Sequence, residues 1–179
     1  MDNHLGKGYV QVYTGNGKGK TTCMLGLTLR AVGAGKKVYI GQFMKSERYS
    51  EVYAIREFLP GVTIEQYGVE SSCFIRKGEA NVAHVEAAHA GYKKAMTVLV
   101  SGEYDLVILD EINVTVYFEL LNEKDALAMI DSRPHGVELV LTGRYATDQV
   151  MARADLVTEM REVKHYFDQG VAARIGIEK

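Results

Sequence analysis

The sequence has few cysteines and no tryptophan. Its 179 residues include two cysteines, Cys23 and Cys73, and two prolines. Two cysteines without a paired spacing cannot build a disulfide framework or a zinc site with four sulfur ligands. This scarcity is typical of proteins in a reducing compartment, so we expect a cytoplasmic location.

Long apolar runs and a surplus of one charge are also lacking. No run approaches the roughly 18 apolar residues of a membrane-spanning helix, and the short polar segment Met1–Gly8 has no apolar core of a signal peptide. The formal net charge is −2, whereas nucleic-acid-binding domains usually carry a clear basic excess. We therefore expect neither a membrane nor nucleic acid as a partner.

The remaining composition is that of an ordinary globular protein. Hydrophobic residues make up 47% of the chain and charged residues 25%. A chain of this length can bury one good apolar core. We predict a single domain, residues 1–179.

A glycine-rich stretch, TGNGKGKTT, follows the first apolar run, Tyr9–Tyr13, and precedes a helical pattern. Glycine adopts backbone angles that let successive N–H groups face phosphate oxygens, and the start of a helix adds unpaired N–H groups. A lysine in this setting binds phosphate, and a hydroxyl ligates magnesium. The predicted phosphate-binding residues are Thr14, Gly15, Asn16, Gly17, Lys18, Gly19, Lys20, Thr21 and Thr22.

One position departs from the usual phosphate-loop pattern, G-x-x-x-x-G-K-[ST]. With Gly19, Lys20 and Thr21 aligned, the first glycine of the pattern falls on Thr14, and glycine arrives one residue late at Gly15. A glycine-rich turn with a nearby lysine is the simpler alternative. The strand before and the helix after favour the phosphate loop, although the motif alone does not specify a reaction.

The rest of the chain alternates between strand and helix patterns. Apolar runs predict further strands at 38–43, 62–67, 106–109, 138–141 and 156–160, and helical spacing predicts helices at 20–32, 52–59, 79–100, 122–130 and 147–154. Residues 68–78 are predicted to form a loop, which at this length is usually either functional or disordered, and the tail from 163 is predicted to be mostly loop with a possible last strand from Ala172. This order predicts an α/β fold, a P-loop NTPase-like (RecA-like) three-layer sandwich with a mostly parallel central sheet.

Charged residues gather at the ends of the predicted strands, where parallel α/β sheets bind ligands. Lys45, Arg144 and Arg161 follow strands, and Asp110 and Glu111 close an aliphatic strand. We expect the cations to bind a triphosphate, and we expect Thr21 with one or both carboxylates to hold a metal ion. An acidic helix cap and salt-bridged surface arginines are the simpler alternatives.

The residues by themselves leave the reaction open. Glu111 stands where many P-loop ATPases place the base that activates water, so an ATPase switch or binding module that forms ADP and phosphate is one candidate. A small-molecule kinase is less favoured because no arginine-rich lid is apparent, and no basic, aromatic groove suggests a DNA motor. The residues predict a nucleotide site beside a second, partly apolar ligand near Tyr67–Arg76.

Five motifs resemble the P-loop type of ATP:corrinoid adenosyltransferase, the cob(I)yrinic acid a,c-diamide adenosyltransferase family. They are TGNGKGKTT (14–22), GQFMK (41–45), VILDE (107–111), LTGR (141–144) and EMREVKHYFDQGVAARIGIE (159–178). The last motif is the most specific, because it is long and no generic nucleotide site requires it. The likeness runs over nearly the whole chain and includes Thr14 in place of the first glycine.

The resemblance implies transfer of the 5′-deoxyadenosyl group of ATP to the cobalt(I) of a corrinoid, cobalamin or cob(I)yrinic acid a,c-diamide, with release of triphosphate. Cobalt(I) is itself the nucleophile, so the protein holds the triphosphate and aligns C5′. Lys20, Lys45, Arg144 and Arg161 would neutralise the leaving group of a nucleotide that lies reversed in the loop. Glu111 would serve the metal or the ribose.

The resemblance also implies the remaining components. Mg²⁺ or Mn²⁺ would accompany ATP, an electron donor such as a flavoprotein would reduce cobalt(II), and the enzyme would be a homodimer that acts in adenosylcobalamin biosynthesis or salvage. Phe74 would be a catalytic aromatic that displaces the lower axial ligand of cobalt. Arg76 stands where relatives carry a second aromatic, a tryptophan.

Overall fold

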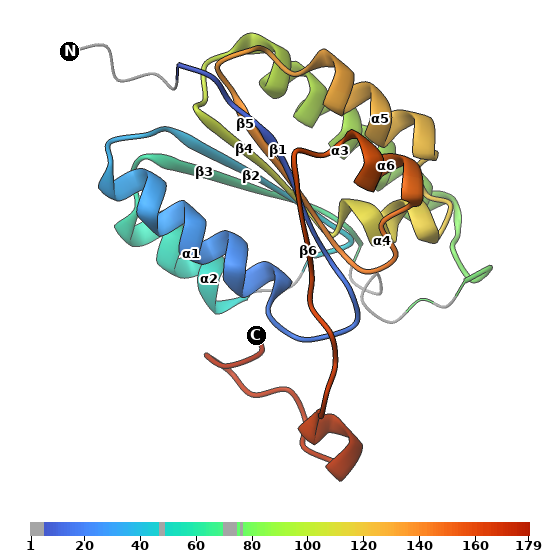
Figure 1. Cartoon of the computed structure of the whole chain (residues 1–179). Helices are drawn as coiled ribbons and strands as arrows, with labels where there is room; N and C mark the ends of the chain where they lie inside the picture. The colour runs from blue at the N-terminus through green and yellow to red at the C-terminus, as the bar shows by residue number, and fades with distance from the viewer. Residues whose placement is uncertain (1–5, 47–48, 70–74, 76) are drawn as a thin grey trace.

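A six-stranded sheet forms the centre of the computed structural model, which describes residues 6–46, 49–69, 75 and 77–179. The strand order is β3-β2-β4-β5-β1-β6, and every neighbouring pair is parallel (Figure 1). The strands are β1 (Val10–Thr14), β2 (Val38–Phe43), β3 (Val62–Tyr67), β4 (Leu106–Asp110), β5 (Glu138–Thr142) and β6 (Leu156–Glu159). The sheet is therefore fully parallel, where the sequence predicted a mostly parallel one.

Helices cover both faces of this sheet (Figure 1). One face carries α1 (Lys20–Gly33) and α2 (Ser50–Phe58), and the other carries α3 (Val82–Ser101), α4 (Ile112–Tyr117), α5 (Glu123–Ser132) and α6 (Asp148–Arg153). The closing segment adds a short 3-10 helix, Tyr166–Gln169. The predicted fold class, a P-loop NTPase-like α/β three-layer sandwich, is confirmed. None of the described helices is long and apolar enough to cross a membrane.

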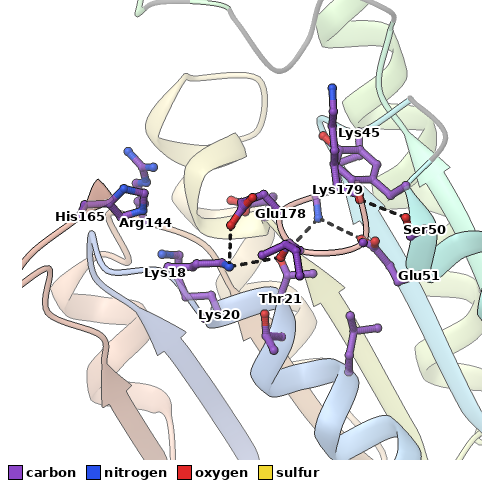
Figure 2. A pocket seen from close by; sticks show the side chains of 17 residues that line it. Lys18, Lys20, Thr21, Lys45, Ser50, Glu51, Arg144, His165, Glu178 and Lys179 are labelled. Carbon is purple, nitrogen blue, oxygen red and sulfur yellow. Dashed lines mark hydrogen bonds and ion pairs between the residues drawn. The ribbon is translucent and has the colours of Figure 1, made fainter. Parts of the chain in front are cut away.

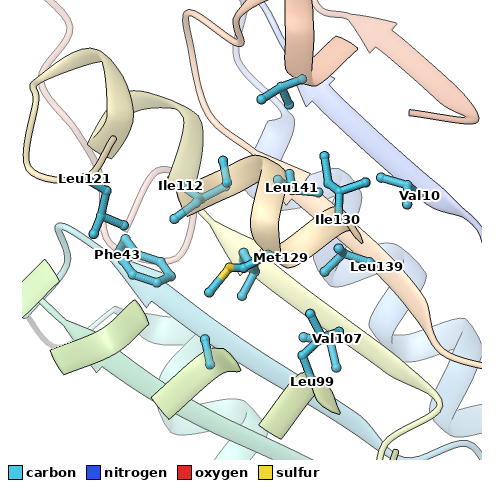
Figure 3. Close-up of a cluster of buried hydrophobic side chains, with 14 of the residues drawn as sticks. Val10, Phe43, Leu99, Val107, Ile112, Leu121, Met129, Ile130, Leu139 and Leu141 are labelled. Atoms are coloured by element: carbon cyan, nitrogen blue, oxygen red, sulfur yellow. The ribbon is translucent and has the colours of Figure 1, made fainter. Parts of the chain in front are cut away.

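Two apolar clusters join the layers, and β4 contributes to both because successive strand residues face opposite sides. Ile108 packs with Met24 of α1 and Ile55 of α2. Val107 and Leu109 belong to the larger cluster on the other face, which Figure 3 shows. All five residues of β4 are buried, as expected for an inner strand of a parallel sheet. Asp110 is consequently carried into the interior by the aliphatic run before it.

Two features differ from the prediction. Helix α4 was not predicted, because its sequence INVTVY is rich in β-branched residues and alternates as a strand does. Glu111, with φ of 62°, turns the chain directly from β4 into this helix. The predicted last strand from Ala172 is wrong: Gly170 and Gly176 have positive φ angles of 80° and 77°, and residues 175–178 form a turn instead.

Candidate active site

Residues from four strand ends come together at the carboxyl edge of the sheet. The glycine-rich loop follows β1, Lys45 follows β2, Asp110 ends β4, and Arg144 follows β5. Figure 2 shows Lys20, Thr21, Lys45 and Arg144 around one cavity. The predicted grouping of strand-end residues is thus present in the fold.

Two loop glycines are required by a close approach of the backbone, and one of them, Gly15, also by its positive φ angle. A Cβ atom on Gly15, whose φ is 94°, would lie 2.5 Å from the Met160 carbonyl oxygen. A Cβ atom on Gly17 would lie 2.8 Å from the carbonyl oxygens of Met160 and Arg161. The Gly17 N–H donates a hydrogen bond of 2.7 Å to the Met160 oxygen. The chain that leaves β6 therefore fixes the shape of this loop.

Lys20 lies inside the loop and is almost fully buried. Its Nζ donates to the carbonyl oxygens of Gly15 and Gly17 at 2.8 and 2.7 Å. Burial lowers the pKa of Lys20 below its usual value. The ammonium group is thus held at the centre of the loop, where a bound phosphate would offer it a better partner than two carbonyl groups.

Asp110 is the buried centre of the polar network and has no exposed surface. Its Oδ2 accepts from Lys45 Nζ at 2.8 Å and from Gln42 Nε2 at 3.1 Å. Its Oδ1 accepts from Thr142 Oγ1 at 2.6 Å and from Thr21 Oγ1 at 3.1 Å. Burial alone would raise the pKa of Asp110, but the Lys45 charge and these hydrogen bonds hold the pKa below its usual value. Asp110 is therefore an ionised carboxylate that orients the hydroxyl of Thr21.

Glu111 differs from its neighbour in environment. Its backbone N–H donates to Thr142 Oγ1 at 3.0 Å, which holds the left-handed turn in place. Burial and the charge of Asp110 raise the pKa of the Glu111 carboxyl. Among the described residues no three His, Cys, Asp or Glu side chains gather closely enough to hold a metal ion by themselves. A metal here would use the adjacent oxygens of Thr21 and Asp110 together with oxygens of the ligand, which suits Mg²⁺.

Two adjoining cavities open at this edge. The larger, about 490 Å³, is called the polar cavity because most of its lining residues are charged or polar, Lys18, Lys20, Thr21 and Arg144 among them. The smaller, about 310 Å³, is called the apolar cavity because apolar and aromatic residues are more frequent in its lining, Met44, Ile75, Val114, Phe118 and Tyr145 among them. Four residues line both cavities: Lys45, Tyr49, Glu111 and Arg144. The site can therefore hold a polyanion beside a bulky apolar ligand.

Some predicted residues lie elsewhere. Arg161 is exposed and belongs to the lining of neither cavity, although its backbone packs on Gly17. Asn16 is exposed, and the hydroxyl of Thr14 accepts from the backbone N–H of Ala146 at 3.2 Å. Phe74 and Arg76 lie outside the described residues.

The structure adds residues that sequence reasoning missed. Gln42 and Thr142 bind Asp110, and Tyr49, His165, Glu178 and Lys179 line the polar cavity. Gln42 and Thr142 lie at strand ends within the quoted motifs GQFMK and LTGR, so strand position was the available signal.

Comparison with known proteins identifies the family. Residues 6–178 match the family described as ATP:corrinoid adenosyltransferase BtuR/CobO/CobP. The corrinoid adenosyltransferase of Escherichia coli (strain K12) is 34% identical over 96% of this chain and 86% of its own length. Corrinoid adenosyltransferase CobA of Salmonella typhimurium is 33% identical over 96% of this chain and 86% of its own length, and the corrinoid adenosyltransferase of Pseudomonas aeruginosa is 35% identical, with 96% and 84% covered.

These matches extend over all five motifs, from the glycine-rich loop to the closing segment. They support ATP-dependent adenosyl transfer to a corrinoid, and they do not favour the ATPase switch that the motifs had left open. The chain therefore belongs to the ATP:corrinoid adenosyltransferase family BtuR/CobO/CobP, and it is an enzyme.

Proposed function

We propose that this enzyme transfers the 5′-deoxyadenosyl group of ATP to the cobalt(I) of cobalamin or of cob(I)yrinic acid a,c-diamide. The observation that carries the proposal is the pair of adjoining cavities, one lined mostly by charged and polar residues and one lined by more apolar and aromatic residues, which share Glu111 and Arg144. The polar cavity would hold the triphosphate, and the apolar one would face the corrinoid. The ribose C5′ then lies at the junction.

The chain supplies the charges that a triphosphate leaving group needs. Lys20, Lys45 and Arg144 lie at the polar cavity, and the hydroxyl of Thr21 and the carboxylate of Asp110 would hold Mg²⁺ or Mn²⁺ on the phosphates. The metal would neutralise phosphate charge. In the reaction the bond from C5′ to oxygen breaks, its electron pair stays on the triphosphate, and cobalt(I) supplies the pair for the new bond to carbon.

This chemistry explains why no water-activating base is needed. Cobalt(I) attacks carbon directly, so the task of the protein is positioning. Glu111 lines both cavities, and burial together with the charge of Asp110 raises the pKa of its carboxyl group. We assign it to the ribose or to the metal rather than to a water molecule.

The apolar cavity supplies candidates for contact with the corrinoid. Phe118 and Tyr145 line it, and Tyr145 stacks on Tyr117 with ring centroids 4.0 Å apart. Tyr67 is a poor candidate, because its hydroxyl is bonded to Tyr39 and Glu65. The role of Phe74 in displacing the lower axial ligand of cobalt stays a prediction.

The decisive experiment supplies ATP, Mg²⁺ or Mn²⁺ and chemically reduced cobalamin and follows the corrinoid spectrum. We expect a light-sensitive adenosylated product together with intact triphosphate. ADP and phosphate in place of triphosphate would identify an ATPase switch, and the absence of an adenosylated product with complete and incomplete corrinoids would sink the proposal.

A variant pair tests the phosphate assignment. Lys20→Ala removes the ammonium group from the centre of the loop and should lower transfer by about 100-fold or more, because it removes stabilisation of the leaving group. Lys93→Ala, an exposed lysine of α3, is the control and should keep full activity. Near-normal transfer by Lys20→Ala would refute the assignment.

The partners follow from the same proposal. An electron donor such as a flavoprotein would reduce cobalt(II) in the cytoplasm, for biosynthesis or salvage of adenosylcobalamin. A homodimer is supported by the edge strand β6, where Leu156 and Val157 are 45% and 43% exposed. Light scattering on the purified protein measures the mass directly, and a monomer at micromolar concentration would contradict the homodimer.

A further inference from the structure

The closing segment, residues 161–179, crosses the mouth of the polar cavity. It leaves the body at Met160, whose carbonyl oxygen accepts from Gly17 of the loop. It returns to the same loop at Lys18, whose Nζ donates to the Ile177 carbonyl oxygen at 3.2 Å and to Glu178 Oε1 at 3.1 Å. Figure 2 shows Glu178 and Lys179 beside the cavity.

Its far end reaches the opposite wall. Ser50 Oγ, in the first turn of α2, donates to the main-chain oxygen of Lys179 at 3.0 Å. The segment therefore bridges the glycine-rich loop and α2. Gly176, Ile177, Glu178 and Lys179 line the cavity from this side.

Apolar packing contributes little to this arrangement. Val163, Phe167 and Ile175 are 91%, 70% and 84% exposed. In Figure 1 the 3-10 helix lies away from the sheet and its helices. Polar contacts with Lys18 and Ser50 thus hold the end of the segment over the cavity, and such contacts open more readily than a packed core.

Two other residues of the closing segment, Arg174 and Tyr166, hold the carboxylate of Glu178 in place. It accepts from the backbone N–H, Nε and Nη2 of Arg174 at 2.9, 3.2 and 3.0 Å, and it also accepts from the hydroxyl of Tyr166. The guanidinium group of Arg174 lies 5.1 Å from the ring centre of Tyr166. The hydrogen bonds from Arg174 and Tyr166 hold the pKa of Glu178 far below its usual value, so it meets Lys18 as an anion.

We propose that residues 174–179 form a lid over the triphosphate end of the site and that Glu178 is a positioning residue for Lys18. This inference rests on the proposed function. The lid borders the cavity without filling it, because a cavity of about 490 Å³ lined by Lys20 and Thr21 remains beneath it. A closed wall excludes water from the leaving group and keeps Lys18 turned toward the cavity rather than toward solvent.

The test needs no corrinoid. The probe is inorganic tripolyphosphate with Mg²⁺, titrated by calorimetry into the wild type and into Glu178→Gln. We expect about fivefold weaker binding by the variant, because losing this partly exposed charge pair releases both the lid and Lys18. Asp168→Asn removes the same charge from an exposed position in the same segment and should bind as the wild type does.

A second variant distinguishes the effect of opening the lid from the effect of removing the Glu178 charge. Ser50→Ala loosens the far anchor without changing any charge, and it should weaken tripolyphosphate binding in the same direction. Trypsin provides a direct readout: cleavage after Arg174 should be faster in both variants than in the wild type, and tripolyphosphate should slow it in the wild type.

If Glu178 hinders the binding of phosphate instead of helping it, the same titration should give a different result. If the Glu178 carboxylate competes with phosphate for Lys18, Glu178→Gln will bind tripolyphosphate as tightly as the wild type or more tightly, and the lid is refuted. Cleavage rates after Arg174 that are insensitive to tripolyphosphate also refute it. Failure of the proposed function would appear separately, as normal tripolyphosphate binding without any adenosylated corrinoid.

Discussion

Replacing Lys45 by methionine tests whether the buried pair with Asp110 organises the site. Lys45 Nζ lies 2.8 Å from Asp110 Oδ2, and the two side chains are 11% and 0% exposed. Methionine keeps much of the apolar stem and removes the charge. The variant therefore leaves an ionised carboxylate in the interior without its cation.

The expected cost follows from what remains around Asp110. Removing one partner of a buried ion pair typically costs about 3–5 kcal/mol. Thr142 and Gln42 still donate to the carboxylate, at 2.6 and 3.1 Å, so we expect the lower end, about 3 kcal/mol at neutral pH. A domain with a total of about 5–15 kcal/mol still folds after this loss.

The pH dependence gives a sharper signature. In the wild type the pKa of Asp110 is lowered from 3.8, so its contribution to stability is present above that pH and is lost as the pH falls through the folded value. In Lys45→Met the lysine no longer opposes the effect of burial, so the folded pKa of Asp110 should be higher than in the wild type. As the pH falls toward that pKa, protonation of Asp110 removes the cost of its unpaired charge in the variant. The difference between wild type and variant should shrink by up to about 1.4 kcal/mol per pH unit.

Urea unfolding at pH 7.5, 6.0 and 5.0 measures this difference. Lys45 itself does not titrate in this range, because the neighbouring carboxylates outweigh its burial and raise its pKa above 10.5. The double variant with Asp110→Asn should lose less than the sum of the two single variants, since no charge is left unpaired. A loss below about 0.5 kcal/mol at pH 7.5, or a deficit that is constant with pH, would refute the reasoning.

Two further predictions concern the loop and Glu111. Gly17→Ala should lower the free energy of unfolding by about 2 kcal/mol or more, because its Cβ would meet the Met160 carbonyl oxygen, whereas Gly26→Ala in open space on α1 should raise it by about 0.5–1 kcal/mol. Equal changes in thermal unfolding would contradict the contact. The pKa of Glu111 is raised from 4.5 by burial and by Asp110, so its carboxyl favours folding below pH 4.5 and loses that contribution as the pH rises through the folded value. Glu111→Gln should therefore stabilise the protein at pH 7 by about 1 kcal/mol, change little at pH 4, and reduce adenosyl transfer; an unchanged stability at pH 7 would count against the burial argument.

Local patterns were enough to place most of the fold and part of the site. Aliphatic runs located the strands, and the glycine-rich stretch located the loop, because both depend on neighbours in sequence. The pairing of Lys45 with Asp110 was not predictable, since it depends on β2 lying beside β4. The contact of Lys18 with Glu178 joins positions 160 residues apart and leaves no periodic signal.

The departure of the loop from the common phosphate motif has a structural cause. Thr14 takes the place of the first glycine, ends β1 and is buried, and its hydroxyl accepts from the backbone N–H of Ala146, two residues after Arg144. A glycine at this position would lose that link between the loop and the segment that carries the arginine. Gly15 and Gly17 then give room to the backbone of Met160. The first motif of the chain and its closing motif are therefore in direct contact, and the positions of Gly15 and Gly17 are explained by the backbone that leaves β6.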